Sequence, residues 1–335
     1  MIYKYFSAGN TPRGFVNYFG DAMNFDDASQ ILYIKGGSGI GKSTLMKKVS
    51  NRAIGNGRDV THIHCSSDKN SLDGVVIDGR IALFDATMPH ISDPLYPRVN
   101  GKIVDLGVAL DESKLTPKKT EIISLVKAKK ECYKNVYSLL STLLSVNEAL
   151  YMTLDIDDIA LCRVAREVAE CIVGEDTRAT RGFVSLIDSA GLLDMTGGII
   201  DDRRVYAITS EIDDVSLRVV DMVSHIIYPT RHAHYYSILE PNRVETLGTS
   251  NSIVTRSPST RRDIIYNIDS SVNIKNKHAY DILKTYRDDI VIEASHLIGE
   301  AQSHHMELEE IYRSAIDYDM LTTIQNKLTD ELLEY

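Results

Sequence analysis

The sequence predicts an α/β protein in which a parallel sheet flanked by helices is present twice, once in each half of the chain. Three observations support this prediction: a glycine-rich loop between an apolar run and an amphipathic run, short segments that recur in the same order, and two long stretches of helical periodicity. The length of 335 residues is enough for two domains, since one domain commonly takes about 100–200 residues. Each half can therefore bury a core of its own.

Composition and charge exclude several classes of protein. With 43% hydrophobic and 25% charged residues, the chain is typical of globular proteins and not of disordered ones. The formal net charge of −10 argues against nucleic acid or an anionic membrane surface as the main partner. We read no signal peptide and no apolar run of the ~20 residues that a membrane helix needs. The cysteines show no C-x-x-C spacing, so we expect reduced thiols in a cytoplasmic protein.

The first predicted element is a strand, a glycine loop and a helix in direct succession. The apolar run 31–34 is typical of a buried parallel strand, and apolar residues at helical spacing follow between 45 and 53. Between them lies a segment that satisfies G-x-x-x-x-G-K-[ST]. This segment consists of Gly36, Gly37, Ser38, Gly39, Ile40, Gly41, Lys42, Ser43 and Thr44.

Each residue type in this loop suits the binding of a triphosphate. Glycines let successive backbone N–H groups converge on phosphate oxygens, and the positive end of the following helix favours anions. Lys42 is predicted to bind the β- and γ-phosphates, Ser43 to ligate Mg²⁺, and Thr44 to lie against the α-phosphate. A glycine turn that only packs a helix on a strand would leave the lysine unexplained. Because no Asn-Lys-x-Asp guanine signature occurs, we expect ATP rather than GTP.

Two later strand candidates each end near a carboxylate. Four apolar residues, 81–84, precede Asp85, a pattern that predicts a Walker B strand whose Asp holds Mg²⁺, although many buried strands end in Asp. The next residue is Ala86 and not the Glu that polarises water in many ATPases. After the strand candidate 59–65, Asp68 is the leading substitute for orienting the nucleophile, because parallel strand ends converge. A role for Asp68 as a cap or turn residue is equally compatible with the pattern.

The two halves of the chain share an ordered series of short matches. Arg13–Val16 recurs as Arg181–Val184, and Glu148 with Tyr151 recurs as Glu309 with Tyr312. A single match could arise by chance, but an ordered series with small length changes indicates an internal duplication. We also align Asp27–Tyr33 with Asp201–Tyr206, which has one residue fewer.

The second copy is predicted to have lost its nucleotide site. After the apolar run 205–208, the glycines and the lysine are absent, and Glu211, Asp213 and Asp214 stand in their place. Two like charges ~4 Å apart repel by roughly 1 kcal/mol even in water, so a triphosphate is disfavoured there. We expect this half to stabilise or regulate the first.

Helical periodicity follows each core. A long amphipathic helix is expected over about 117–152, a second one ends before Gly174, and the later copies cover about 279–315 and 320–333. The predicted organisation is a nucleotide-binding core at 1–110, a helical hairpin at 111–175, a degenerate core at 176–268 and a second hairpin at 269–335. The hairpins are expected to pack on each other as a bundle, while a role as an arm for a protein partner or for homo-oligomerisation stays open.

Five segments of the chain, taken together, form a recognisable set: Phe6–Phe15, Lys35–Thr44, His64–Asp68, Ser71–Gly74 and Thr87–His90. With these segments the chain resembles a largely uncharacterised bacterial family of tandem P-loop ATPases, within the Walker A P-loop NTPase superfamily. The resemblance is dense up to about residue 107 and implies ATP binding without indicating the substrate. The chain departs from the family pattern because its second half lacks a Walker A motif.

The function predicted from the sequence is Mg²⁺-dependent ATP hydrolysis at one site in the N-terminal half, coupled to a conformational or partner-binding switch. The site residues are the loop 36–44, with Lys42, Asp68 and Asp85 as catalytic groups and Ser43 and Asp85 as metal ligands. A small-molecule kinase that transfers the γ-phosphoryl group of ATP is the alternative. A nucleotide-binding interaction protein without turnover is a third possibility.

Overall fold

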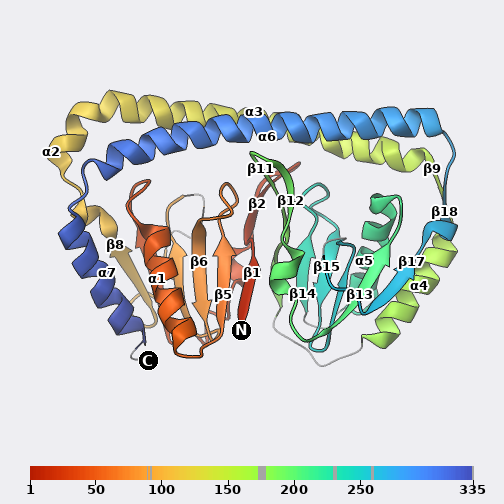
Figure 1. The fold of residues 1–335 in the computed structure, drawn as a ribbon, viewed down its shortest axis with the longest axis horizontal. Coiled ribbons are helices and arrows are strands. Elements are labelled where there is room, and N and C mark those ends of the chain that lie inside the picture. Colours follow the sequence, from red (N-terminus) through yellow and green to blue (C-terminus); the bar gives the residue numbers. More distant parts are fainter. Residues whose placement is uncertain (89, 91–92, 173–178, 229–231, 258–259, 334–335) are drawn as a thin grey trace. The chain divides into compact units, whose positions relative to one another are not determined.

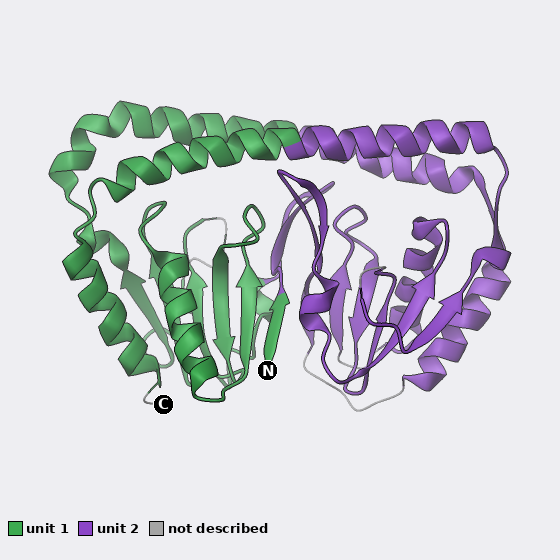
Figure 2. Cartoon of the chain, viewed as in Figure 1, with its two compact units in different colours: residues 1–4, 19–135, 296–335 green, residues 5–18, 136–295 purple. Residues whose placement is uncertain are grey.

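The computed structural model describes residues 1–88, 90, 93–172, 179–228, 232–257 and 260–333 (Figure 1). The chain divides into two compact units (Figure 2). Unit 1 comprises residues 1–4, 19–135 and 296–335, and unit 2 comprises residues 5–18 and 136–295. In the described part of the chain, no helix has the length and apolarity that crossing a membrane requires.

Unit 1 is built on a six-stranded mixed sheet in the order β1-β5-β6-β7-β4-β8. The strands are β1 Ile2–Tyr5, β4 Gln30–Lys35, β5 Val60–His64, β6 Leu72–Ile77, β7 Ile81–Asp85 and β8 Gly101–Asp105. Strand β4 pairs in parallel with β7 and β8, whereas β6 runs antiparallel to β5 and β7. The expectation of a wholly parallel sheet is therefore wrong.

A tight hairpin turn explains the antiparallel strand. Residues 78–80 join β6 to β7, and Asp78 and Gly79 have φ angles of 49° and 67°. The N–H of Arg80 donates to the carbonyl of Ile77 at 3.0 Å, so Asp78 and Gly79 are the central residues of a β-turn. Positive φ at both is typical of a type I′ turn, for which Asp-Gly is a favoured pair. This signal was present in the sequence, but β6 was not predicted as a strand.

Helices cover the sheet of unit 1. The helical elements that lie wholly in this unit are η1 Phe19–Asp21, α1 Lys42–Gly55, η2 Leu106–Ala109, α2 Glu112–Leu115, η3 Thr116–Lys118 and α7 Tyr318–Leu333. The long helices α3 Lys119–Met152 and α6 Lys277–Arg313 contribute residues to both units. In the core, Leu45 and Val49 of α1 join Leu328 of α7 and the strand residues Leu32 and Leu83. The predicted helix after the glycine loop thus buries its apolar face against the sheet.

Unit 2 repeats the strand order of unit 1, as β10-β14-β15-β16-β13-β17. These strands are β10 Thr180–Phe183, β13 Arg204–Thr209, β14 Ala233–Tyr236, β15 Val244–Gly248, β16 Ser252–Thr255 and β17 Ile264–Asn267. As β6 does in unit 1, β15 runs antiparallel to both of its neighbours, β14 and β16. The other described pairings of this sheet, β10 with β14, β13 with β16 and β13 with β17, are parallel. The expectation of an α/β fold present twice is confirmed at this level.

The remaining elements of unit 2 are two helices, short helical turns and three two-stranded sheets. They are β2 Ala8–Thr11 with β3 Gly14–Asn17, β11 Ser185–Asp188 with β12 Gly191–Asp194, β9 Leu154–Ile156 with β18 Val272–Ile274, α4 Asp158–Cys171, α5 Asp213–Ile226, η4 Thr196–Ile199 and η5 Asp269–Ser271. The core joins α4 and α5 to the sheet, with Leu161, Val219 and Leu247 among its fully buried members.

The two short helices do not form the expected bundle with the long ones. Helix α4, from the first half of the sequence, packs on α5 in unit 2, and α7, from the second half, packs on α1 in unit 1 (Figures 1 and 2). The predicted segments 111–175 and 269–335 are accordingly each divided between the two units. Both helices carry an apolar stripe. Burying such a stripe against a sheet removes its apolar surface from water, which stabilises the fold.

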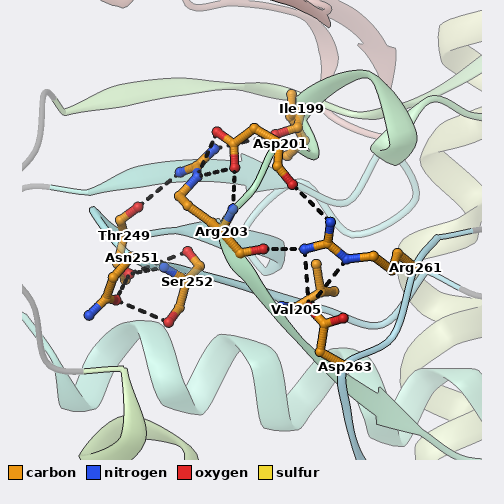
Figure 3. A network of polar contacts seen from close by, with 9 residues as sticks. All are labelled: Ile199, Asp201, Arg203, Val205, Thr249, Asn251, Ser252, Arg261 and Asp263. Atoms are coloured by element: carbon orange, nitrogen blue, oxygen red, sulfur yellow. Dashed lines mark hydrogen bonds and ion pairs between the residues drawn. The ribbon is translucent and has the colours of Figure 1, made fainter.

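A polar network fastens the first residues of β13 in unit 2 (Figure 3). Arg203 Nε donates to both carboxylate oxygens of Asp201, at 2.8 and 2.9 Å, and Arg203 Nη1 donates to the carbonyl of Thr249 at 2.9 Å. Arg261 bonds Asp263, which in turn accepts the backbone N–H of Val205. This network lies at the amino end of β13, whereas the carboxyl end of β13 leads to α5. The network therefore stabilises the start of the strand and is remote from the end that leads to α5.

Candidate functional site

The glycine loop of unit 1 connects β4 to α1 as predicted. Gly36, Gly39 and Gly41 have φ angles of 153°, 71° and 88°, a region that side chains rarely adopt. A Cβ atom on Gly36 would lie only 2.8 Å from Ile40 Cγ2, and Ile40 itself is buried. The loop conformation therefore depends on its glycines, and Ile40 anchors it in the core.

Lys42 and Asp85 are brought together at the carboxyl edge of the sheet. The Nζ atom of Lys42 donates to the carbonyls of Gly36 at 2.9 Å and Gly37 at 3.1 Å, and it lies 3.5 Å from Asp85 Oδ2. Both charged side chains are largely covered, with 13% and 14% exposure. Because Ile34 of β4 pairs with Asp85 of β7, the two parallel strands place this carboxylate beside the loop.

Ser43 lies at the first turn of α1, where its Oγ accepts the backbone N–H of Leu72 at 2.9 Å. The next residue, Thr44, is exposed. Mg²⁺ prefers a few hard oxygen ligands and keeps several water or phosphate oxygens, and a hydroxyl with Asp85 supplies such donors. Among the described residues there is no group of three or more His, Cys, Asp or Glu able to hold a metal ion. Mg²⁺ at this edge would therefore draw most of its ligands from phosphate and water.

Asp68 stabilises a local turn through its side chain and its carbonyl. Its Oδ1 accepts the backbone N–H of Asn70 at 2.9 Å, its carbonyl accepts that of Ser71, and its side chain is exposed. Within the described residues we find no hydrogen bond or ion pair from Asp68 to Lys42 or Asp85. The structure thus brings the loop, Lys42, Ser43 and Asp85 together and leaves Asp68 in the turn that was its alternative.

Asp73, on β6, is a buried acid that the sequence analysis did not identify. It is 6% exposed, and its Oδ2 lies 3.4 Å from Nε2 of His90. Burial raises the pKa of Asp73; His90 and Lys42 oppose this rise, whereas Asp85 adds to it. An acid inside the apolar run 72–77 is the signal that could have revealed this group, had that run been predicted as a strand.

The C-terminal helices pack directly on the glycine loop within unit 1. A Cβ atom on Gly37 would lie 2.9 Å from the ring of Tyr312, and one on Gly39 would lie 3.0–3.2 Å from Glu309, backbone included. Gln325 of α7 donates to the carbonyl of Gly41 at 3.3 Å. The glycines therefore serve close helix packing as well as the curl of the loop.

A second cation reaches this region from α3. Lys129 Nζ lies 3.4 Å from Nδ1 of His305, whose Nε2 lies 3.4 Å from Glu309 Oε1. Burial lowers the pKa of Lys129, and the charge of Lys42 lowers it further. An anion between the two lysines would relieve this repulsion.

The corresponding edge of unit 2 carries the opposite charge at two positions and an acid again at a third. Aligning β13 with β4 by their bounds and pairing places Asp213 where Lys42 stands and Arg256 where Asp85 stands. Glu245 likewise takes the place of Asp73, since Thr246 pairs with Thr255 as Gly74 pairs with Phe84.

Internal ion pairs fill this edge of unit 2. Arg287 Nη1 bonds both carboxylate oxygens of Asp214, at 2.6 and 2.8 Å, and Arg256 Nη2 lies 2.9 Å from Glu245. The backbone N–H of Glu211, in the shortened loop, donates to Asp269 Oδ1 at 2.7 Å. Carboxylates of the protein thus occupy donors that a phosphate would need.

Comparisons with models of protein families, with curated proteins and with solved structures find no match for this chain. The functional interpretation accordingly depends on the residues and geometry described above.

Proposed function

We propose that the protein binds ATP with Mg²⁺ at one site, in unit 1, and hydrolyses it there. The observation that supports this most directly is the position of Lys42, whose Nζ is held by two loop carbonyls 3.5 Å from Asp85. A lysine at the start of a helix, behind a loop of left-handed glycines, is the arrangement that phosphate binding uses.

Different residues of unit 1 would bind the phosphates and the metal ion. Loop amides from Gly36 to Gly41 bind the phosphates, Lys42 neutralises the β/γ end, and Ser43 with Asp85 hold Mg²⁺. Mg²⁺ held by Ser43 and Asp85 would supply positive charge that offsets the negative charge developing during phosphoryl transfer. In the free protein Lys42 is paired with Asp85 and loop carbonyls, and binding would exchange these contacts for phosphate oxygens.

We propose further that nucleotide binding shifts the C-terminal helices. The support is the packing of Gly37 on Tyr312 and of Gly39 on Glu309, so close that a movement of the loop would move the end of α6. Packed groups without free space transmit displacement rather than absorb it. This coupling gives the ATPase a route to a conformational or partner-binding switch.

Calorimetry with MgATP tests the binding site. Lys42→Ala should weaken ATP binding by roughly 100-fold or more, because it removes a charge-assisted contact from a partly dry site. Lys47→Ala, an exposed lysine on the same helix, is the matched control and should change the affinity by no more than about twofold. Binding that survives Lys42→Ala would contradict the assignment.

Phosphate release separates hydrolysis from transfer to an acceptor. The wild-type protein should release inorganic phosphate from MgATP without any added acceptor. ADP that forms only when a metabolite extract is present would instead establish the kinase alternative.

A further inference from the structure

The position that follows the Walker B acid cannot supply a catalytic group. Ala86 is 3% exposed, and its N–H donates to the carbonyl of Ile34 at 2.9 Å, so it continues the pairing of β7 with β4. Asp68 lies in its exposed turn. If ATP is hydrolysed in unit 1, the carboxylate that handles the attacking water has to come from elsewhere than these two positions.

Strand β6 places an acid at the same edge of the sheet. Gly74 pairs with Phe84, so the preceding Asp73 lies level with Asp85 on the neighbouring strand. The backbone N–H of Leu72, the residue just before Asp73, donates to Ser43 Oγ. Asp73 is therefore next to a residue in contact with the start of α1, and the charges of Lys42 and Asp85 both act on it.

The surroundings of Asp73 suit a group that transfers a proton. Its Oδ2 is buried and lies 3.4 Å from Nε2 of His90, and the buried thiol of Cys65 also interacts with this carboxyl. The ring of Phe19 packs edge-on against the His90 ring, with centroids 5.0 Å apart, which helps to fix the histidine. A desolvated carboxyl beside a histidine, close to a second carboxylate, is a common arrangement of acid–base groups.

The equivalent acid of unit 2 shows that the fold does not need this arrangement. Glu245 is paired with Arg256 at 2.9 Å and accepts a hydrogen bond from Ser185. Where the site has lost its loop and lysine, the buried acid is thus neutralised by an arginine. In unit 1 the same strand position keeps an acid whose partner is a titratable imidazole, which points to a use in the reaction.

We propose that Asp73, positioned by His90, orients the attacking water and takes its proton. The water oxygen forms a bond to the γ-phosphorus, the bond from that phosphorus to the bridging oxygen of ADP breaks, and the departing electron pair stays on ADP. The proton of the water passes to the Asp73–His90 pair and from there to solvent. This inference depends on the proposed ATP hydrolysis in unit 1.

Asp73→Asn tests the inference through a split between turnover and binding. We expect kcat for phosphate release to fall by roughly 100-fold or more, in the range that a positioned general base contributes. The affinity for MgATP should stay within about threefold, because the loop and Lys42 are unchanged. Asp78→Asn, at the far end of the same hairpin, is the matched control and should leave both quantities unchanged. His90→Gln keeps the carboxylate and should lower kcat by roughly tenfold, again without loss of binding.

These measurements separate a failure of the Asp73 inference from a failure of the proposed ATP binding and hydrolysis. If wild-type protein does not bind MgATP, both proposals are wrong. If it binds MgATP but releases no phosphate, ATP binding stands and this inference is overturned. Turnover by Asp73→Asn at the wild-type rate, or a parallel loss of binding and turnover in both variants, would also overturn it. Circular dichroism of each variant shows whether the fold is intact.

Discussion

Units 1 and 2 share a strand order, but of three equivalent positions at one sheet edge they differ in charge at two and keep an acid at the third. Lys42, Asp85 and Asp73 in unit 1 stand where unit 2 has Asp213, Arg256 and Glu245. In unit 2 the arginine pairs with the buried glutamate, while in unit 1 two acids share an edge with a lysine and a histidine. The comparison teaches that both sheets bury an acid at this strand position and that its partner differs, an arginine in unit 2 and a histidine in unit 1.

The largest expected effect comes from breaking the internal pair of unit 2. Glu245→Gln removes the ion-pair partner of the buried Arg256 guanidinium, and we expect the free energy of unfolding to fall by about 3 kcal/mol. Asp73→Asn, the equivalent change in unit 1, breaks no contact with arginine and should cost about 1 kcal/mol or less. Urea unfolding followed by circular dichroism measures both, and hydrogen exchange of the 244–255 segment assigns the loss to unit 2. Equal losses would contradict the comparison.

Arg287→Ala should have the next largest effect. It removes a bidentate contact to Asp214 in which both side chains are largely covered, and we expect a loss of about 1.5–3 kcal/mol in the local stability of α5. Arg218→Ala serves as the control, because its partner Asp158 is mostly exposed and such pairs contribute about 1 kcal/mol or less. Hydrogen exchange of residues 213–226 reports the difference. No difference between the variants would show that the α6–α5 contact does not stabilise unit 2.

A glycine substitution separates loop packing from loop conformation. Gly39 and Gly57 both have positive φ, but only Gly39 faces another backbone, that of Glu309 at 3.2 Å. Positive φ costs an alanine about 1 kcal/mol at either site, so Gly39→Ala should be less stable than Gly57→Ala by about a further 1 kcal/mol. Thermal unfolding of the two variants measures this. Identical melting temperatures would remove the argument that the loop and α6 are coupled by packing.

The smallest expected effect is one that both units share. His62 of β5 and His234 of β14 occupy equivalent positions, and burial lowers the pKa of each, to about 4 for His62. The unfolded chain binds protons below pH 6.5 and the folded one does so only at lower pH, so stability is complete above pH 6.5 and declines as pH falls toward 4.

Each histidine is partly open to solvent, so we expect a contribution of about 1 kcal/mol or less from each. His62→Gln and His234→Gln should each flatten the decline of stability between pH 6.5 and 4, as measured by urea unfolding at a series of pH values. A pH profile that neither substitution changes would assign the acid sensitivity to other groups.

The sequence predicted the parts of the site that local patterns encode. The loop, the helix from Lys42 and the strand before Asp85 follow from a spaced motif and from periodicity, and the structure has all three. The duplication was also visible, although the strand bounds align Tyr206 with Leu32 and not with Tyr33. A one-residue shift of this kind is hard to detect because apolar residues fill both strands.

The parts that were missed depend on pairing and packing between distant segments. Asp73 was not predicted as a site residue because β6 has an acid and a glycine inside an apolar run and was not predicted as a strand. The Asp78-Gly79 pair is the local signal for the hairpin that contains β6. The placement of α4 and α7 could not follow from periodicity, since an amphipathic stripe shows that a helix is buried without showing on which sheet. The pairing of Arg256 with Glu245 likewise appears only once the strands are in register.

Hydrogen exchange with and without MgATP tests most directly the claim that nucleotide binds to unit 1 alone. The account predicts slower exchange of the amides in residues 36–44 when MgATP is present, together with unchanged exchange in residues 209–216. Protection of the 209–216 segment, or no protection in either segment at saturating MgATP, would contradict it.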